Sequence, residues 1–108
     1  MMEETLGPDL ARQISRLFAA LSDPTRVRII ARLVDDEVNV GDLAQLVDMS
    51  ESAVSHQLRT LRQLRLVRRR KVGREVYYTL DDDHVADLFR RSLEHVKHQT
   101  PGDRGLPG

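Results

Sequence analysis

Three of the four histidines lie near the C-terminus, beside a run of aspartates, in the stretch DDDHVADLFRRSLEHVKHQ (residues 81–99). Imidazole and carboxylate groups are ligands that zinc and similar divalent metals bind. Apolar residues recur in this stretch at helical spacing, so we expect a helix from about Asp83 to His98. On that helix His84 and His95 point the same way and are separated by about 16 Å, at about 1.5 Å per residue.

One helix cannot bring His84 and His95 to a single ion, because bonds from zinc to imidazole are only about 2 Å long. His95 and His98 can share an ion, and so can Asp82 and His84 at the start of the helix. A second, antiparallel copy that crosses near Arg90 would place the first pair of one chain against the second pair of the other. By symmetry, this arrangement predicts two identical sites with four ligands each.

The aspartate ligand is not fixed by spacing alone. Asp81 or Asp83 could take the place of Asp82, or Asp83 could cap the helix. A single histidine at the edge of an apolar stripe is more often a surface residue than a ligand, but four ligand types at this spacing favour a metal site. The stripe beside the histidines predicts the contact between the two copies, through Val85, Leu88, Phe89, Ser92 and Val96.

Composition limits the class of protein. A chain of 108 residues forms one small domain and often gains core by pairing with a copy of itself. It has no cysteine, which excludes disulfides and thiolate metal sites. No apolar run approaches the length of a membrane span, and the first residues do not have the pattern of a signal peptide. We therefore expect a soluble, cytoplasmic protein without a membrane partner.

Charge is unevenly distributed although the formal net charge is zero. From Ser52 to Arg74 the chain contains no Asp or Glu. The basic residues of that window are Arg59, Arg62, Arg65, Arg68, Arg69, Arg70, Lys71 and Arg74. So basic a segment in a neutral chain indicates a polyanionic partner, and nucleic acid is the first candidate.

The expected elements are helices followed by a hairpin and a final helix. Asp23, Asn39 and Ser50 each precede a helical pattern and are predicted caps. The helices are expected over residues 8–21, 24–34, 40–47, 51–64 and 83–98, and the hairpin over 67–71 and 75–80. This order predicts a mainly α winged helix-turn-helix fold with a β-hairpin wing, spanning residues 1–98, and a disordered tail over 99–108.

The fourth helix and the hairpin carry side chains suited to double-stranded DNA. In the major groove, Gln pairs well with adenine and Arg with guanine, and basic residues of a wing can grip the phosphate backbone. The predicted DNA-binding residues are Ser52, Ser55, His56, Gln57, Arg59, Arg68, Arg69, Arg70, Lys71 and Arg74. Which of these contact bases is not readable from the sequence.

The segments FAALSDPTRVRIIARL, VGDLAQLVDMSESAVSHQLRTLRQLRLV and GREVYYTL together resemble the ArsR/SmtB family of winged-helix metal-responsive repressors. The resemblance covers about residues 10–98. It implies a cytoplasmic homodimer whose metal-free form binds operator DNA and leaves it when metal binds. It also suggests a relay from the ring of His95 to the backbone near Arg65.

The SmtB-like, zinc-sensing branch of that family carries Asp-x-His followed by His-x-x-His between two C-terminal helices. Asp82, His84, His95 and His98 match that pattern. The resemblance therefore implies zinc, or cobalt, as an allosteric effector, with two ions per dimer. Some family members have a second site with cysteines on the third helix. Here Asn39-Val40-Gly41 occupies that stretch, so we expect that site to be absent.

Three alternatives stay open. The protein could be a winged-helix repressor that is regulated by a signal other than metal. Its response to that signal would then survive replacement of His95 by Gln. A zinc hydrolase could use the same ligands with Glu94 as base, but the ligand set looks closed, so we expect no enzyme. A dimeric scaffold without a DNA role would leave the basic hairpin unexplained, and a salt titration of DNA binding would test it.

Overall fold

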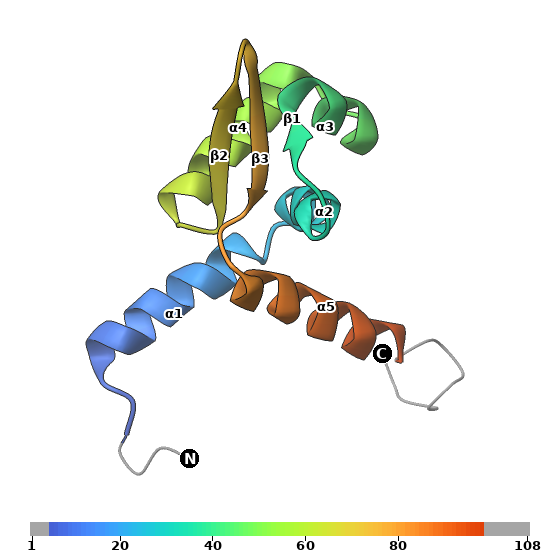
Figure 1. Cartoon of the computed structure of the whole chain (residues 1–108). Helices are drawn as coiled ribbons and strands as arrows, with labels where there is room; N and C mark the ends of the chain where they lie inside the picture. The colour runs from blue at the N-terminus through green and yellow to red at the C-terminus, as the bar shows by residue number, and fades with distance from the viewer. Residues whose placement is uncertain (1–4, 99–108) are drawn as a thin grey trace.

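The computed structural model describes residues 5–98 and has the predicted order of elements, with one short strand in addition (Figure 1). The elements are α1 (Pro8–Ala20), α2 (Pro24–Leu33), β1 (Val38–Asn39), α3 (Val40–Val47), α4 (Glu51–Gln63), β2 (Val67–Val72), β3 (Glu75–Leu80) and α5 (Asp83–Lys97). The predicted mainly α fold with a hairpin wing is confirmed. The prediction of a disordered tail at 99–108 lies outside the described residues.

Three predicted caps begin the helices of the DNA-binding part. The side chains of Asp23, Asn39 and Ser50 accept hydrogen bonds from backbone N–H groups three residues further on, at 3.0, 2.8 and 3.1 Å. Each bond satisfies one of the N–H groups that have no partner within a helix. The sequence therefore determines where α2, α3 and α4 begin.

The residue that caps α5 is not Asp83, which was one of the alternatives left open by the sequence. Asp82, not Asp83, precedes the helix in an extended conformation, and its Oδ1 accepts a hydrogen bond from the N–H of Val85 at 3.1 Å. Asp83 is the first residue of the helix, where its negative charge interacts favourably with the positive end of the helix dipole. The candidate metal ligand Asp82 is thus also a structural residue.

The sheet is antiparallel, with strand order β1-β3-β2. Strand β1 was not predicted, because two residues are too few to show an alternating pattern. The turn between β2 and β3 consists of Gly73 and Arg74, and Gly73 has φ +61°. A positive φ at the first central residue is what a type II′ hairpin turn requires, and glycine adopts it without strain.

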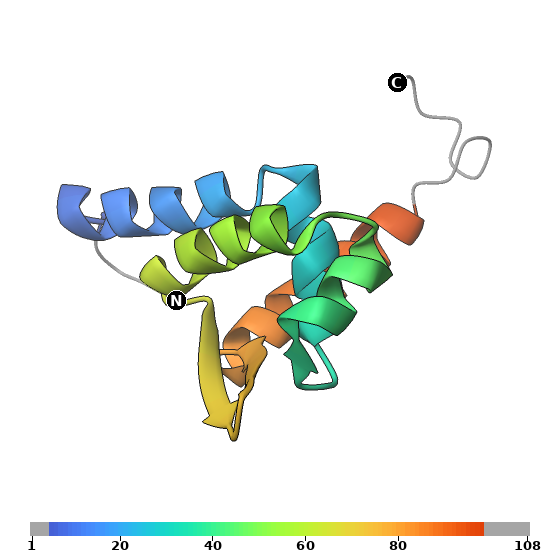
Figure 2. The same ribbon diagram turned by 90° about the horizontal axis from the view of Figure 1, so that it is seen from above.

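The core lies between α2, α3, α4 and the sheet. Its fully buried side chains are those of Ile29, Ile30, Leu33, Leu43, Val47, Val54, Leu58, Leu61 and Val67. In Figure 1, α1 and α5 lie at the end of the molecule opposite the hairpin tip, and Figure 2 shows the hairpin projecting from the helices. Of the described helices, none is long and apolar enough to cross a membrane.

Candidate metal and DNA-binding sites

The first candidate pair of metal ligands lies at the start of α5. The Nδ1 of His84 is 3.7 Å from Oδ1 of Asp82. The side chain of His84 is 96% exposed and that of Asp82 is 50% exposed, so solvent reaches both. Because the cap uses Oδ1 of Asp82, the second carboxylate oxygen is outside that hydrogen bond. Both side chains can therefore reach a ligand outside their own chain.

The second pair, His95 and His98, lies at the other end of the same helix, and both residues are exposed. His98 forms the C-cap of α5, where its backbone N–H donates to the carbonyl of Glu94 at 3.2 Å. Within residues 5–98, no three His, Asp or Glu side chains come together as a metal site. One chain thus holds the two candidate pairs apart.

The predicted contact stripe of α5 divides between two environments. Val85 and Phe89 pack against the core of their own chain, and with Leu88 they line a small apolar cavity of about 90 Å³ that α2 closes. Val96 stays 64% exposed, and Leu93, which was not among the predicted residues of the stripe, is 42% exposed. The inner residues of the stripe therefore pack partly within their own chain, whereas Val96 at its outer end stays exposed.

Helix α1 also presents an apolar surface. Leu10, Ile14 and Phe18 lie on one face of this helix and are 49, 36 and 58% exposed. The helix expected over residues 8–21 is present, but it packs against the core mainly through its C-terminal part, where Ala20 is buried and Leu17 half-buried. Large apolar side chains exposed together commonly mark a protein–protein contact.

The candidate DNA-binding helix α4 has an outer face and a flank. Ser52, His56 and Arg59 are exposed, whereas Ser55 and Gln57 are half-buried. Gln57 is engaged within the chain, since its Oε1 accepts a hydrogen bond from Nε of Arg26 on α2 at 3.0 Å. This contact could not be predicted from the sequence, because no local pattern links residues 31 positions apart.

The basic residues of the wing differ in their surroundings. Arg68, Arg69, Arg70, Lys71 and Arg74 are all exposed. Arg70 nevertheless binds Glu37 in a two-pronged ion pair, Nε to Oε2 at 3.0 Å and Nη2 to Oε1 at 2.5 Å. The hydrogen bond from Arg70 holds the pKa of the Glu37 carboxyl below its ordinary value of 4.5. The charge of Arg70 is thus already compensated within the chain.

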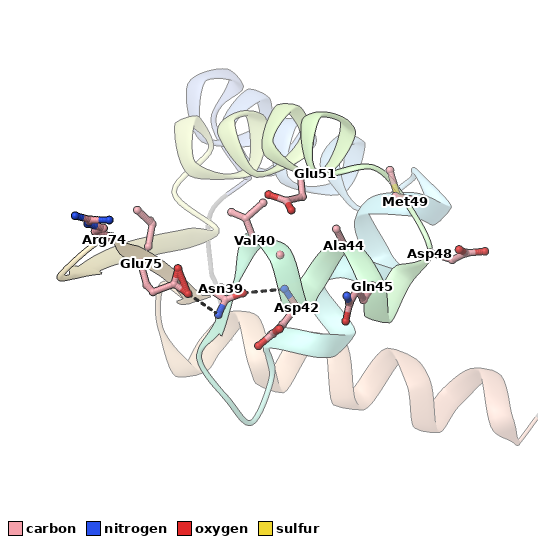
Figure 3. A pocket seen from close by; sticks show the side chains of 12 residues that line it. Asn39, Val40, Asp42, Ala44, Gln45, Asp48, Met49, Glu51, Arg74 and Glu75 are labelled. Atoms are coloured by element: carbon pink, nitrogen blue, oxygen red, sulfur yellow. Dashed lines mark hydrogen bonds between the residues drawn. The ribbon is translucent and has the colours of Figure 1, made fainter.

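A polar hollow of about 720 Å³ separates α3 and the start of α4 from the wing (Figure 3). Asn39 lines this hollow, and its Nδ2 donates to Oε1 of Glu75 on β3 at 3.4 Å while its Oδ1 caps α3. The carboxylates of Asp42 and Glu51 also line the hollow. Asn39 therefore links the wing to the helix-turn-helix.

The fold, the basic hairpin and the exposed face of α4 define a winged helix-turn-helix protein of the DNA-binding class. Residues 23–69 match the sequence profile of bacterial regulatory proteins of the arsR family. The chain belongs to the ArsR family, whose members are transcriptional regulators.

Two curated relatives and one solved structure extend this result. The chain is 49% identical to the transcriptional repressor SmtB homolog of Synechocystis over 94 residues, which covers 87% of this chain and 71% of the relative. It is 41% identical over 93 residues to the regulator NmtR of Mycobacterium tuberculosis, covering 86% and 78% of the two chains. The homodimeric winged helix-turn-helix domain Mb0332 of Mycobacterium bovis superposes with a TM-score of 0.80 at 26% identity, covering 91% and 93%.

Proposed function

We propose that this chain is a cytoplasmic, zinc-responsive transcriptional repressor that binds operator DNA as a homodimer and releases it when metal binds between the two α5 helices. The observation that carries the proposal is the placement of the four candidate ligands. They form two exposed pairs at opposite ends of one helix, and within residues 5–98 no third His, Asp or Glu joins either pair as a metal site. Membership of the ArsR family and similarity to a repressor of the SmtB type support it.

The donor set fits zinc. Three imidazoles and one carboxylate suit a tetrahedral ion, and cobalt accepts the same ligands. Asp82 and His84 of one copy, with His95 and His98 of a second, would hold each ion, so that a dimer has two sites. Bound metal would supply a bridge between the two helices. Because the second copy completes each site, metal binding and the arrangement of the dimer depend on one another.

The DNA-binding role rests on α4 and the wing. The exposed face of α4 carries Ser52, His56 and Arg59. The adjacent hairpin adds Arg68, Arg69, Lys71 and Arg74, which form no ion pair within the described part of the chain. A recognition helix of this kind enters the major groove, and a dimer sets two such helices one turn of DNA apart. Under this proposal, the single domain would carry both the DNA-binding surface and the metal ligands.

The two sites must be coupled in free energy. If zinc weakens DNA binding by some factor, DNA must weaken zinc binding by the same factor. Helix α5 contacts β3, and β3 pairs with β2 in the wing. A change in the angle between two α5 helices would therefore reach the wing and α4 through the sheet, and would alter the spacing of the two recognition helices.

A zinc titration of the DNA-bound dimer tests the proposal, with fluorescence anisotropy of the labelled promoter duplex as the measurement. We expect release at one zinc per protomer, and loss of release in His95→Gln with metal-free DNA affinity unchanged. Glu94→Gln is the matched control, because it changes an exposed neighbour on α5 that is outside the ligand set. Tight DNA binding that ignores both zinc and cobalt would leave a repressor that responds to another signal, and would remove the metal site.

A further inference from the structure

Arg26, in the first turn of α2, is in contact with the recognition helix. Its Nε donates a hydrogen bond to Oε1 of Gln57 at 3.0 Å, and both residues are half-buried. The two residues are 31 positions apart, so only the fold brings them together. Neither α2 nor Arg26 was among the predicted DNA-binding elements.

Chemistry fixes the orientation of this pair. A guanidinium has only N–H donors, so the group of Gln57 that faces it must be the carbonyl oxygen. The groups left over on the pair are the Nη1 and Nη2 of Arg26 and the Nε2 of Gln57, which are all donors. A group that accepts hydrogen bonds and carries negative charge is the natural ligand of such a cluster.

The charge of Arg26 has no counterpart within the described part of the chain. No Asp or Glu among residues 5–98 forms an ion pair with it. The nearby Asp23 uses its side chain to accept from the backbone N–H of Arg26. Arg70 and Arg90, in contrast, pair with Glu37 and Asp35. The guanidinium of Arg26 keeps its positive charge and has only N–H donors, so it can bind an anion from outside the chain.

Gln57 lies at the edge of the DNA-binding surface and not at its centre. On α4 it stands between the exposed face, which holds Ser52 and His56, and the fully buried residues Val54 and Leu61. The edge of a helix in the major groove faces the sugar-phosphate backbone, whereas its centre faces the base edges. The position of Gln57 and the donor groups of the pair therefore both favour a phosphate of the DNA backbone as the ligand.

We propose that Arg26 and Gln57 form one phosphate-binding unit, in which Gln57 holds the guanidinium in place and both bind the DNA backbone. The proposal rests on the proposed function, since it assumes operator binding through α4. It assigns a DNA contact to α2 and gives Gln57 a phosphate as its partner in place of adenine. Its effect on affinity is independent of base sequence.

The test compares Arg26→Ala, Gln57→Ala and the double variant with Arg28→Ala. Arg28 is the matched control, because it is an exposed arginine on the same helix with the same charge. Binding is measured by anisotropy, over a range of salt concentrations, to duplexes that the wild-type protein selects from a randomised pool and to scrambled duplexes. Thermal unfolding of each variant shows whether the fold is retained.

We expect Arg26→Ala to weaken DNA binding about tenfold, equally on selected and scrambled duplexes. The slope of log affinity against log salt should fall by about one per protomer, which a purely structural role would not produce. Arg28→Ala should have a smaller effect. The double variant should lose less than the sum of the single losses, because the two residues act as one unit.

Two results would overturn the inference while leaving operator binding in place. One is an unchanged salt slope in Arg26→Ala, with a loss no larger than that of Arg28→Ala. The other is a loss confined to particular base pairs, which would mean that the pair reads bases. Failure of the wild-type protein to bind any duplex would overturn the proposed function itself, and this inference with it.

Discussion

At the scale of single residues, arginines with the same formal charge differ in whether a carboxylate of the chain pairs with them. Arg70 stands among four other basic residues of the wing, but Glu37 neutralises it. Arg26 stands on α2, and no carboxylate among residues 5–98 forms an ion pair with it. Residues with the same formal charge are therefore expected to contribute differently to DNA binding.

The ion pair between Glu37 and Arg70 predicts a pH effect. Because the folded-state pKa of Glu37 is lowered from 4.5, the pair stabilises the fold above that pH and is lost as pH falls through the lowered value. Both side chains are exposed, so the contribution is small. In Arg70→Gln, carboxyl NMR should show the pKa of Glu37 moving up toward 4.5.

The neighbouring Arg68→Gln is the control for this measurement. Arg68 acts on Glu37 only through its charge, as the smallest of the causes, so its removal should move the pKa less. Equal shifts in the two variants would show that the hydrogen bond with Arg70 is not formed in solution.

At the scale of elements, the wing depends on its turn. Gly73 has φ +61°, a conformation that costs a residue with a Cβ about 1–2 kcal/mol. A Cβ at this position would meet no atom within 4 Å, so backbone strain is the whole cost. Gly73→Ala should therefore lower the free energy of unfolding by about that amount, measured by chemical denaturation.

Gly41→Ala provides the comparison, because Gly41 lies inside α3 and its added Cβ would make only ordinary contacts, 3.6 Å from Asn39 and 3.7 Å from Glu51. Alanine favours helix, so this change should be neutral or stabilising. If both substitutions were neutral, the wing turn in solution would not have the conformation described.

At the scale of the whole molecule, the apolar surface is incomplete. The exposed side chains of Leu10, Ile14 and Phe18 on α1, with Leu93 and Val96 on α5, have no cover within residues 5–98. Leu93 and Val96 neighbour the candidate ligand His95 at the end of α5. A second copy would cover apolar surface and complete the metal sites at once.

Introducing a charge on this surface should produce a monomer. Phe18→Asp removes an exposed aromatic side chain and leaves the core untouched, so the chain should fold but sediment as a monomer in ultracentrifugation. Its zinc affinity should fall, because each site would have lost two ligands. Leu46→Asp is the control, since Leu46 is 44% exposed on α3, away from α1 and α5. A dimeric Phe18→Asp would place the dimer contact elsewhere.

The sequence by itself determined the elements and their order, because caps such as Asn39 and Ser50 and the helical and alternating periods are local signals. It also determined that His84 and His95 cannot share an ion on one helix. The tertiary structure decided the contacts between distant residues. Val85 and Phe89 pack against the core, Glu37 forms an ion pair with Arg70, and Arg26 donates a hydrogen bond to Gln57. Such contacts join residues distant in the chain, so only packing reveals them.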